Sequence, residues 1–241
     1  IMFIFISIYV LVACVAVLAI LKWNVLGFQI VVLMSLVHFG VGDSAFLNEL
    51  DRLKGKTSSH LPTTFVVLAF GSIPVVMPLI NSSSTSALSQ VNTNLINWHQ
   101  GFDQGLRSIV LALFIVALVA LVVTKRFRDV IDLFLLAALA VLTPPLIAFA
   151  VYFGCWHAMR HTARLTLSLE SSQRAYKEGN LRKVFLSAVL PGTPALVGTF
   201  VIAGALALLG NEFNDDFFWM ALVVVWALTV PHMAVTAKLD R

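Results

Sequence analysis

The chain has 241 residues, of which 59% are hydrophobic and 12% are charged. Soluble proteins carry about 25% charged residues, so this composition excludes a soluble enzyme, a disordered chain and a nucleic-acid-binding module. The net charge of +4 comes from 16 Lys and Arg against 12 Asp and Glu, and the basic residues lie between long apolar runs. We therefore expect one membrane domain over residues 1–241, surrounded by the lipid bilayer and without a nucleic-acid partner.

The apolar runs predict an all-α fold, a polytopic bundle of transmembrane helices. A helix needs about 20 apolar residues to cross the hydrocarbon core of a membrane. The clear spans lie at about residues 1–21, 25–47, 61–80, 98–124, 182–209 and 217–237. The first run is too long and too uniformly apolar for a cleavable signal peptide and lacks a basic region, so we interpret it as a span.

Residues 130–168 fit two descriptions, because Thr143, Pro144 and Pro145 interrupt them. Adjacent prolines remove two backbone donors and disfavour a helical conformation in the preceding residue. One kinked helix would give about seven spans in total, and two shorter helices would give about eight. Only eight spans place every basic loop on one side of the membrane, so we expect eight, with both termini cytoplasmic. The basic loop residues are Arg52, Lys54, Lys56, Lys125, Arg126, Arg128, Arg174, Lys177, Arg182, Lys183, Lys238 and Arg241.

A run of small polar residues, 82–86, precedes the fourth span and is typical of a helix start. We expect Ser84 to cap a helix that runs through Ala87 and Leu88 towards Trp98.

Five of the six histidines lie inside expected spans, where an ionisable side chain is costly and marks a functional site by default. They are His38, His99, His157, His161 and His232, whereas His60 lies in a loop. Any one of the five could be a core histidine bonded to a neighbouring helix, but five in one bundle favour a metal or haem site. Four of them share one depth, and His99 joins that layer only if its helix begins near Thr85.

His157 and His161 are the strongest spacing signal, because residues four apart share one helix face and can bind one ion together. Neutral imidazole suits iron, copper, zinc or nickel. A catalytic metal keeps one position open for substrate or dioxygen, and three or four histidines leave that room at iron. Cys14 and Cys155 lie in apolar segments and form no CxxC motif, so they indicate no disulfide framework or zinc site.

Two aspartates accompany the histidines. Asp103 follows His99 by four residues, shares its helix face and could accept a hydrogen bond from a ligand imidazole. Asp43 follows His38 by five residues, about 140° around a regular helix, so it reaches a histidine only if the helix is distorted or the histidine is on another helix. An equally weighted alternative for both is pairing with an intramembrane arginine. The arginines available are Arg107 and Arg160.

Four histidine motifs follow one another along the chain. They are His38-Phe39-Gly40-Val41-Gly42-Asp43, Trp98-His99-Gln100-Gly101-Phe102-Asp103, Trp156-His157-Ala158-Met159-Arg160-His161 and Pro231-His232-Met233. In this order they resemble the motifs of the Brp/Blh family of membrane-bound β-carotene 15,15′-dioxygenases. That family usually has HGAxD first and HFG second, where this chain has HFGVGD and HQG, so the histidines and aspartates are retained.

The resemblance implies a polytopic iron(II) enzyme of a prokaryotic cell membrane. Such an enzyme uses O2 to split the central double bond of β-carotene into two all-trans-retinal molecules for a retinal-binding rhodopsin. The iron ligands it implies, and so the catalytic residues, are His38, His99, His157 and His161. Residues expected to bond or supplement these ligands are Asp43, Asp103 and His232, the last left open as a further ligand. Aromatic side chains that could line a polyene tunnel, or simply pack between helices, are Phe39, Trp98, Phe102, Tyr152, Phe153 and Trp156.

Other membrane functions stay open from the residues alone. A haem-binding b-type electron carrier would use pairs of transmembrane histidines as axial ligands. A membrane desaturase or hydroxylase would need more paired histidine clusters, and a passive transporter could use the His and Asp residues as a relay. A rhodopsin requires a lysine inside a late span, and an intramembrane zinc protease requires HExxH; the sequence has neither.

Overall fold

The computed structural model describes residues 2–55, 63–194, 197–198, 201 and 215–239, and every regular element in these ranges is a helix. The predicted all-α fold is therefore confirmed for the described residues. The helices are α1 (Met2–Lys22), α2 (Asn24–Leu53), α3 (Thr63–Leu79), α4 (Ser84–Ser89), η1 (Thr93–Leu95), α5 (Asp103–Val123), α6 (Phe127–Leu142), α7 (Pro145–Val151), η2 (Tyr152–His157), α8 (Ala158–Ser168), α9 (Glu170–Lys177), α10 (Leu181–Val189), η3 (Leu190–Gly192) and α12 (Asp215–Leu239).

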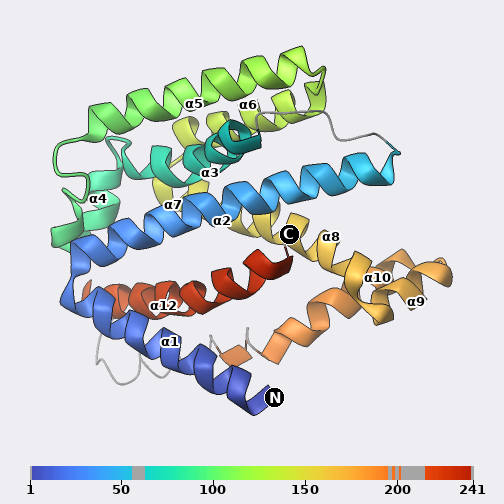
Figure 1. Cartoon of the computed structure of the whole chain (residues 1–241). Coiled ribbons are helices and arrows are strands. Elements are labelled where there is room, and N and C mark those ends of the chain that lie inside the picture. The colour runs from blue at the N-terminus through green and yellow to red at the C-terminus, as the bar shows by residue number, and fades with distance from the viewer. Residues whose placement is uncertain (1, 56–62, 195–196, 199–200, 202–214, 240–241) are drawn as a thin grey trace.

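Helix α2 runs through the middle of the bundle, with α3, α5 and α6 on one side and α1 and α12 on the other (Figure 1). Two glycines bring α2 and α3 into close contact. A Cβ on Gly40 would lie 2.0 Å from the carbonyl oxygen of Val67, and one on Gly71 would lie 1.9 Å from that of Leu36. Small residues at such crossings let helix backbones pack tightly inside a membrane. The apolar core surrounds this crossing and includes Phe39, Ala69, Phe70 and Ile73.

Four described helices are long and apolar enough to cross a membrane. They cover Phe3–Lys22, Asn24–Leu53, Asp103–Val123 and Trp219–Thr236, and a shorter apolar helix covers Thr64–Leu79. Large apolar side chains on the outside of these helices are exposed, for example Phe3 at 82% and Val123 at 74%, as expected where helices meet lipid. The total of eight spans is not confirmed, and the orientation of the helices in the membrane stays a prediction.

The chain breaks at the two prolines of residues 130–168. Helix α6 ends at Leu142, Thr143 is extended with φ −116° and ψ 154°, and α7 begins at Pro145. The predicted division into two helices at the prolines is therefore confirmed, and the alternative of one kinked helix is not. The second continues from α7 through η2 into α8, and at ~1.5 Å per residue it is roughly 36 Å long, against roughly 24 Å for α6.

A helix begins at Ser84, as the small polar run predicts, but its predicted extension to Trp98 and the Ser84 cap are wrong. Helix α4 is short, and the chain passes through η1 and a turn before α5 begins. Gln100 and Gly101 have positive φ values of 52° and 79°, which a right-handed helix does not contain. The Ser84 hydroxyl donates to the carbonyl oxygen of Asn81 at 2.6 Å instead of capping the helix.

Helices α9 and α10 form a hairpin that packs against α8 beside the main bundle (Figure 1). Gly179, with φ 72°, lies in the turn between them. The predicted span 182–209 thus starts as a helix, but the 3-10 turn η3 with Pro191 follows α10 directly. Most of the remainder of that span lies outside the described residues, as does His60.

Candidate functional site

Four of the five intramembrane histidines gather between α2, the junction of η2 with α8, and α12. The ring centroid of His38 lies 5.2 Å from that of His157 and 5.8 Å from that of His232. His161 lies 6.4 Å from His157, with the rings nearly parallel, and 6.3 Å from His232. These contacts close a ring of four imidazoles, which we call the histidine cluster. The predicted shared face of His157 and His161 is confirmed.

The histidine cluster is deeply buried on one side and open on the other. His38 and His157 are buried, at 9% and 6% exposure. His161 is half-buried, and His232 on α12 is exposed. A small molecule could therefore approach the cluster from the side of α12.

His157 ends a π-helical turn, η2, inside an otherwise α-helical segment. Such turns widen the helix by one residue and are frequent at functional sites. On α2, Gly42 faces the ring: a Cβ there would lie 3.0 Å from Cε1 of His157. The glycine therefore makes room for His157 beside α2.

The cluster offers the kind of donor that binds a metal ion, and its neighbouring rings lie close together. Nδ1 of His157 is buried without a hydrogen-bond partner, a costly state that a bound ion would relieve. Two imidazoles on one ion have ring centroids roughly 4.5–6.5 Å apart for a metal–nitrogen distance of about 2.1 Å, and the spacings in the cluster fall in this range. Within the described residues, no three His, Cys, Asp or Glu side chains already stand in ligand geometry. Metal binding would therefore require the imidazoles to rearrange.

Thr236 connects α12 to His38. Its hydroxyl lies 3.4 Å from Nδ1 of His38 and donates to the carbonyl oxygen of His232 at 3.1 Å. A hydroxyl that donates to a carbonyl can accept the ring N–H, so the proton of His38 would sit on Nδ1 and leave Nε2 as an electron-pair donor. Helix α12 thus brings both an imidazole and a group that orients His38.

His99 lies apart from the cluster, in the turn between η1 and α5. Its ring contacts Trp98 at 5.9 Å, and its Nδ1 is also buried without a hydrogen-bond partner. Asp103 is the first residue of α5, so the predicted shared helix face of His99 and Asp103 is wrong. Arg107, offered above as an alternative partner of Asp103, donates to the carbonyl oxygen of Ile80. The role of His99 as a ligand stays a prediction.

Asp43 is fully buried and binds an arginine rather than a histidine. Its carboxylate accepts hydrogen bonds from the Tyr152 hydroxyl at 3.1 Å and from Nη1 of Arg160 at 3.3 Å. Nη2 of Arg160 donates to Asp132 at 2.6 Å, and its guanidinium carbon lies 4.1 Å from the centre of the Trp156 ring. The arginine alternative for Asp43 is confirmed, and Arg160 links α8 to α2 and α6.

Sequence reasoning missed Asp132. The signal was available, because Asp132 is an ionisable residue within the apolar run 130–143, and such residues are expensive in a membrane unless they are paired. The same rule that selected the histidines also applies to this carboxylate.

The six aromatic residues proposed as tunnel lining divide into two groups. Three have ring centroids 4.5 to 6.4 Å from that of His157, in order of distance Phe39, Tyr152 and Phe153. The others lie elsewhere: Trp156 against Arg160, and Trp98 and Phe102 next to His99. The structure therefore brings only the first group to the histidine cluster.

Comparison with known proteins finds the same family that the histidine motifs resemble. The family model described as Beta-carotene 15,15'-dioxygenase matches residues 1–240. The probable β-carotene 15,15′-dioxygenase Blh of Halobacterium salinarum is 26% identical over 223 residues, covering 85% of this chain and 64% of that protein. A β-carotene 15,15′-dioxygenase of the uncultured marine bacterium 66A03 is 24% identical over 213 residues, covering 85% of this chain and 68% of that protein.

The chain thus spans about two thirds of the length of these two relatives. No solved structure matches it. The family match covers nearly all of the chain, and so the chain belongs to the β-carotene 15,15′-dioxygenase family.

Proposed function

We propose that the chain cleaves the central 15,15′ double bond of β-carotene with O2 to form two molecules of all-trans-retinal. The observation that carries the proposal is the gathering of His38, His157, His161 and His232 in a chain of a family named for this reaction. The reaction balances without a further reductant, because the carbon–carbon double bond breaks and each retinal aldehyde retains one atom of O2.

The cofactor in this proposal is a single iron(II) ion. Its ligands are His38, His157 and His161, with either His232 or His99 as the fourth. When bound, iron supplies the activation of dioxygen for the cleavage. Support comes from the buried Nδ1 atoms of His157 and His99, which have no hydrogen-bond partner, and from the presence of His232 in the histidine cluster.

Neighbouring residues hold the histidines in place. Arg160 is one residue from His161 and three from His157, so its bonds to Asp43 and Asp132 fix the helical turn that carries both imidazoles. The Thr236 hydroxyl orients His38 from the other side. This support keeps the reacting geometry without contact between Arg160 or Thr236 and the substrate.

β-Carotene dissolves in hydrocarbon, and its length is comparable with the ~30 Å core of the bilayer, so a site inside the bundle can take it directly from lipid. A row of aromatic rings leads from the surface to the cluster. Phe149 and Phe153 are exposed and stacked at 5.9 Å, Phe153 lies 6.2 Å from buried Phe39, and Phe39 lies 4.5 Å from His157. We propose that this row guides the polyene to the metal.

The proposed setting is a prokaryotic cell membrane that also contains a microbial rhodopsin, with both termini of the chain in the cytoplasm. The apolar helices support the membrane location. Retinal formed in the bilayer would reach a rhodopsin without crossing water.

The test is expression of the chain in a bacterium that makes β-carotene, followed by chromatography of the extracted pigments. We expect loss of β-carotene and accumulation of retinal. Persistent β-carotene, with expression and iron content confirmed, would reject the proposed substrate. A Soret band in the absorption spectrum of the purified protein would instead support the haem-carrier alternative.

Replacement of single histidines tests the ligand set. His157→Ala or His161→Ala should remove both iron and cleavage while the protein still folds in detergent. The iron content of His232→Ala is compared with that of His99→Ala. The fourth ligand is the histidine whose replacement lowers the iron content. His60→Ala, in a predicted loop, is the control and should be nearly neutral. A His157→Ala protein that lost iron but cleaved β-carotene normally would refute the site.

A further inference from the structure

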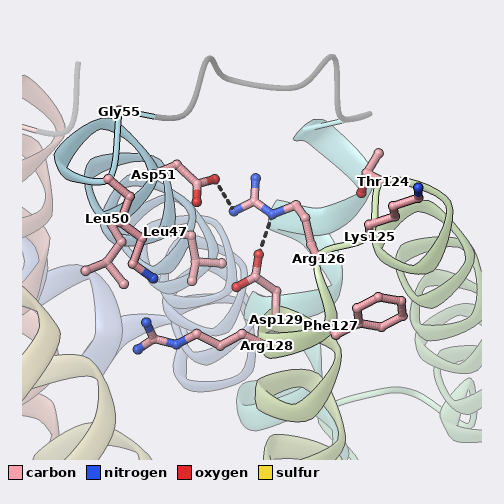
Figure 2. A pocket seen from close by; sticks show the side chains of 11 residues that line it. Leu47, Leu50, Asp51, Gly55, Thr124, Lys125, Arg126, Phe127, Arg128 and Asp129 are labelled. Atoms are coloured by element: carbon pink, nitrogen blue, oxygen red, sulfur yellow. Dashed lines mark hydrogen bonds and ion pairs between the residues drawn. The ribbon is translucent and has the colours of Figure 1, made fainter.

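A pocket of about 560 Å³ lies where α2 ends and α5 turns into α6, away from the histidine cluster (Figure 2). Its walls combine apolar side chains, such as Leu50 and Phe127, with four cationic ones. The cations are Lys54, Lys125, Arg126 and Arg128. The pocket is therefore a second site whose chemistry differs from that of the histidine cluster.

Internal ion pairs neutralise only part of this charge. Arg126 binds Asp51 at 3.1 Å and also binds Asp129, so both carboxylates of the pocket converge on one cation (Figure 2). Within the described residues, Lys54, Lys125 and Arg128 form no ion pair. Four cations and two carboxylates leave the pocket with a net charge of +2.

Helix electrostatics explain two of the unpaired cations but not the third. Lys54 and Lys125 follow the C-terminal ends of α2 and α5, where a positive charge is favourable. Arg128 instead lies in the first turn of α6, where the helix dipole and the free N–H groups are already positive. An anion in the pocket would stabilise Arg128 together with this helix end.

The position of the pocket indicates the source of the anion. Helices α2 and α5 are both long and apolar enough to span a membrane, so their ends lie at the level of the lipid headgroups. Basic pockets between transmembrane helices bind anionic headgroups. Leu50 lines the pocket on the side to which the Arg128 guanidinium points, and it offers a surface for an acyl chain (Figure 2).

From the unpaired cations and the apolar wall of the pocket, we propose that it binds the phosphate headgroup of an anionic phospholipid. The phosphate binds at Lys54 and Arg128, and an acyl chain packs against Leu50, which lines the same pocket. This site is independent of the cleavage reaction.

The experiment uses the purified full chain in detergent and titrates it with short-chain phosphatidylglycerol, phosphatidylcholine or inorganic phosphate. Binding is measured by microscale thermophoresis for wild type, Lys54→Gln/Arg128→Gln and the matched control Lys177→Gln/Arg182→Gln. The control removes the same charge from α9 and α10. Each basic residue near an anionic lipid contributes roughly a fivefold factor, so the first double variant should bind phosphatidylglycerol about 30-fold more weakly.

The expected result is a preference for phosphatidylglycerol over phosphatidylcholine that the control keeps and the pocket variant loses. Equal binding of the two lipids, or equal binding by the two double variants, would overturn the proposal. Saturable binding of inorganic phosphate that is lost in the pocket variant would identify a free-phosphate site and also overturn the lipid assignment. If the double variant does not fold, Arg128→Gln alone should show about a fivefold loss.

Discussion

Arg160 and Arg126 make the same type of connection at two places in the bundle. Each arginine bridges one carboxylate on α2 and one on α6, and each side chain is 11% exposed. Arg160 comes from α8, whereas Arg126 comes from the turn between α5 and α6. Their partners are Asp43 with Asp132 and Asp51 with Asp129, respectively.

The two arginines differ in their surroundings. Arg160 is enclosed by the rings of Trp156 and Phe46, and its partner Asp43 also accepts a bond from Tyr152. Arg126 opens onto a pocket that holds three further cations. The same bridge therefore fixes the helical turn that carries His157 and His161 in one place and lies in a positively charged pocket in the other.

Replacing each arginine in turn should give the largest difference in stability between the two bridges. Arg160→Gln leaves Asp43 buried with no cation, and breaking a buried pair in this way costs about 3–5 kcal/mol. Arg126→Gln should cost less, about 2 kcal/mol, because Asp51 is 24% exposed and reaches water, whereas the second carboxylate, Asp129, is buried at 8%. Thermal unfolding in detergent measures both effects, and retinal formation should fall only for Arg160→Gln.

A second substitution checks the cause of the Arg160 effect. Adding Asp43→Asn to Arg160→Gln removes the uncompensated charge and should recover part of the lost stability. If the double variant is less stable than Arg160→Gln alone, the buried charge is not the source of the loss.

Gly42→Ala should act on the histidine cluster more than on stability. The added Cβ would lie 3.0 Å from Cε1 of His157, so the ring must move by a few tenths of an ångström, at a cost of about 1 kcal/mol. We expect slower retinal formation and reduced iron content. Gly154→Ala is the matched control, since its Cβ would meet no atom within 4 Å. Equal activity of the two variants would show that Gly42 does not position His157.

The sequence predicts the apolar helices and the histidine cluster well, because hydropathy and the four-residue spacing of His157 and His161 are local properties. The break before Pro145 also follows from local chemistry. The predicted span 98–124 includes the turn at Gln100 and Gly101, where both residues take positive φ. A local signal for the turn was present, because residues 97–105 are mainly polar and the apolar run begins only after them. This error removed the basis for placing His99 at the depth of the other histidines.

The partners of Asp43 were not decided by the sequence for a different reason. They come from η2 and α8, more than 100 positions later in the chain, and only packing selects Arg160 over Arg107. The π-helical turn that aims His157 also has no local signal that we recognised. Long-range pairs and backbone irregularities are thus the parts that the structure adds.

Tyr152→Phe tests the bond that distinguishes Asp43 from Asp51. Phenylalanine keeps the buried ring and removes the hydroxyl that donates to Asp43 at 3.1 Å. A hydrogen bond to a charged group contributes about 1.5–3 kcal/mol, and Arg160 still satisfies the carboxylate, so we expect a loss near the lower value. In the Arg160→Gln background the loss should be larger, because Tyr152 is then one of fewer donors. Additive losses in a double-mutant cycle would contradict a shared network.

Salt should produce the smallest difference between the two arginines. Raising the ionic strength from 0.1 M to 1 M shortens the Debye length from about 10 Å to about 3 Å, which weakens charge pairs that reach water. The destabilisation caused by Arg126→Gln should therefore shrink by a few tenths of a kcal/mol in 1 M NaCl, because Asp51 is partly exposed. The destabilisation caused by Arg160→Gln should not change, since Asp43 is 0% exposed. Unfolding temperatures of wild type and both variants at the two salt concentrations give these differences. An equal salt effect on both variants would mean that water and ions reach Arg160 as easily as Arg126. The bridge formed by Arg160 would then be no better shielded from solvent than the bridge formed by Arg126.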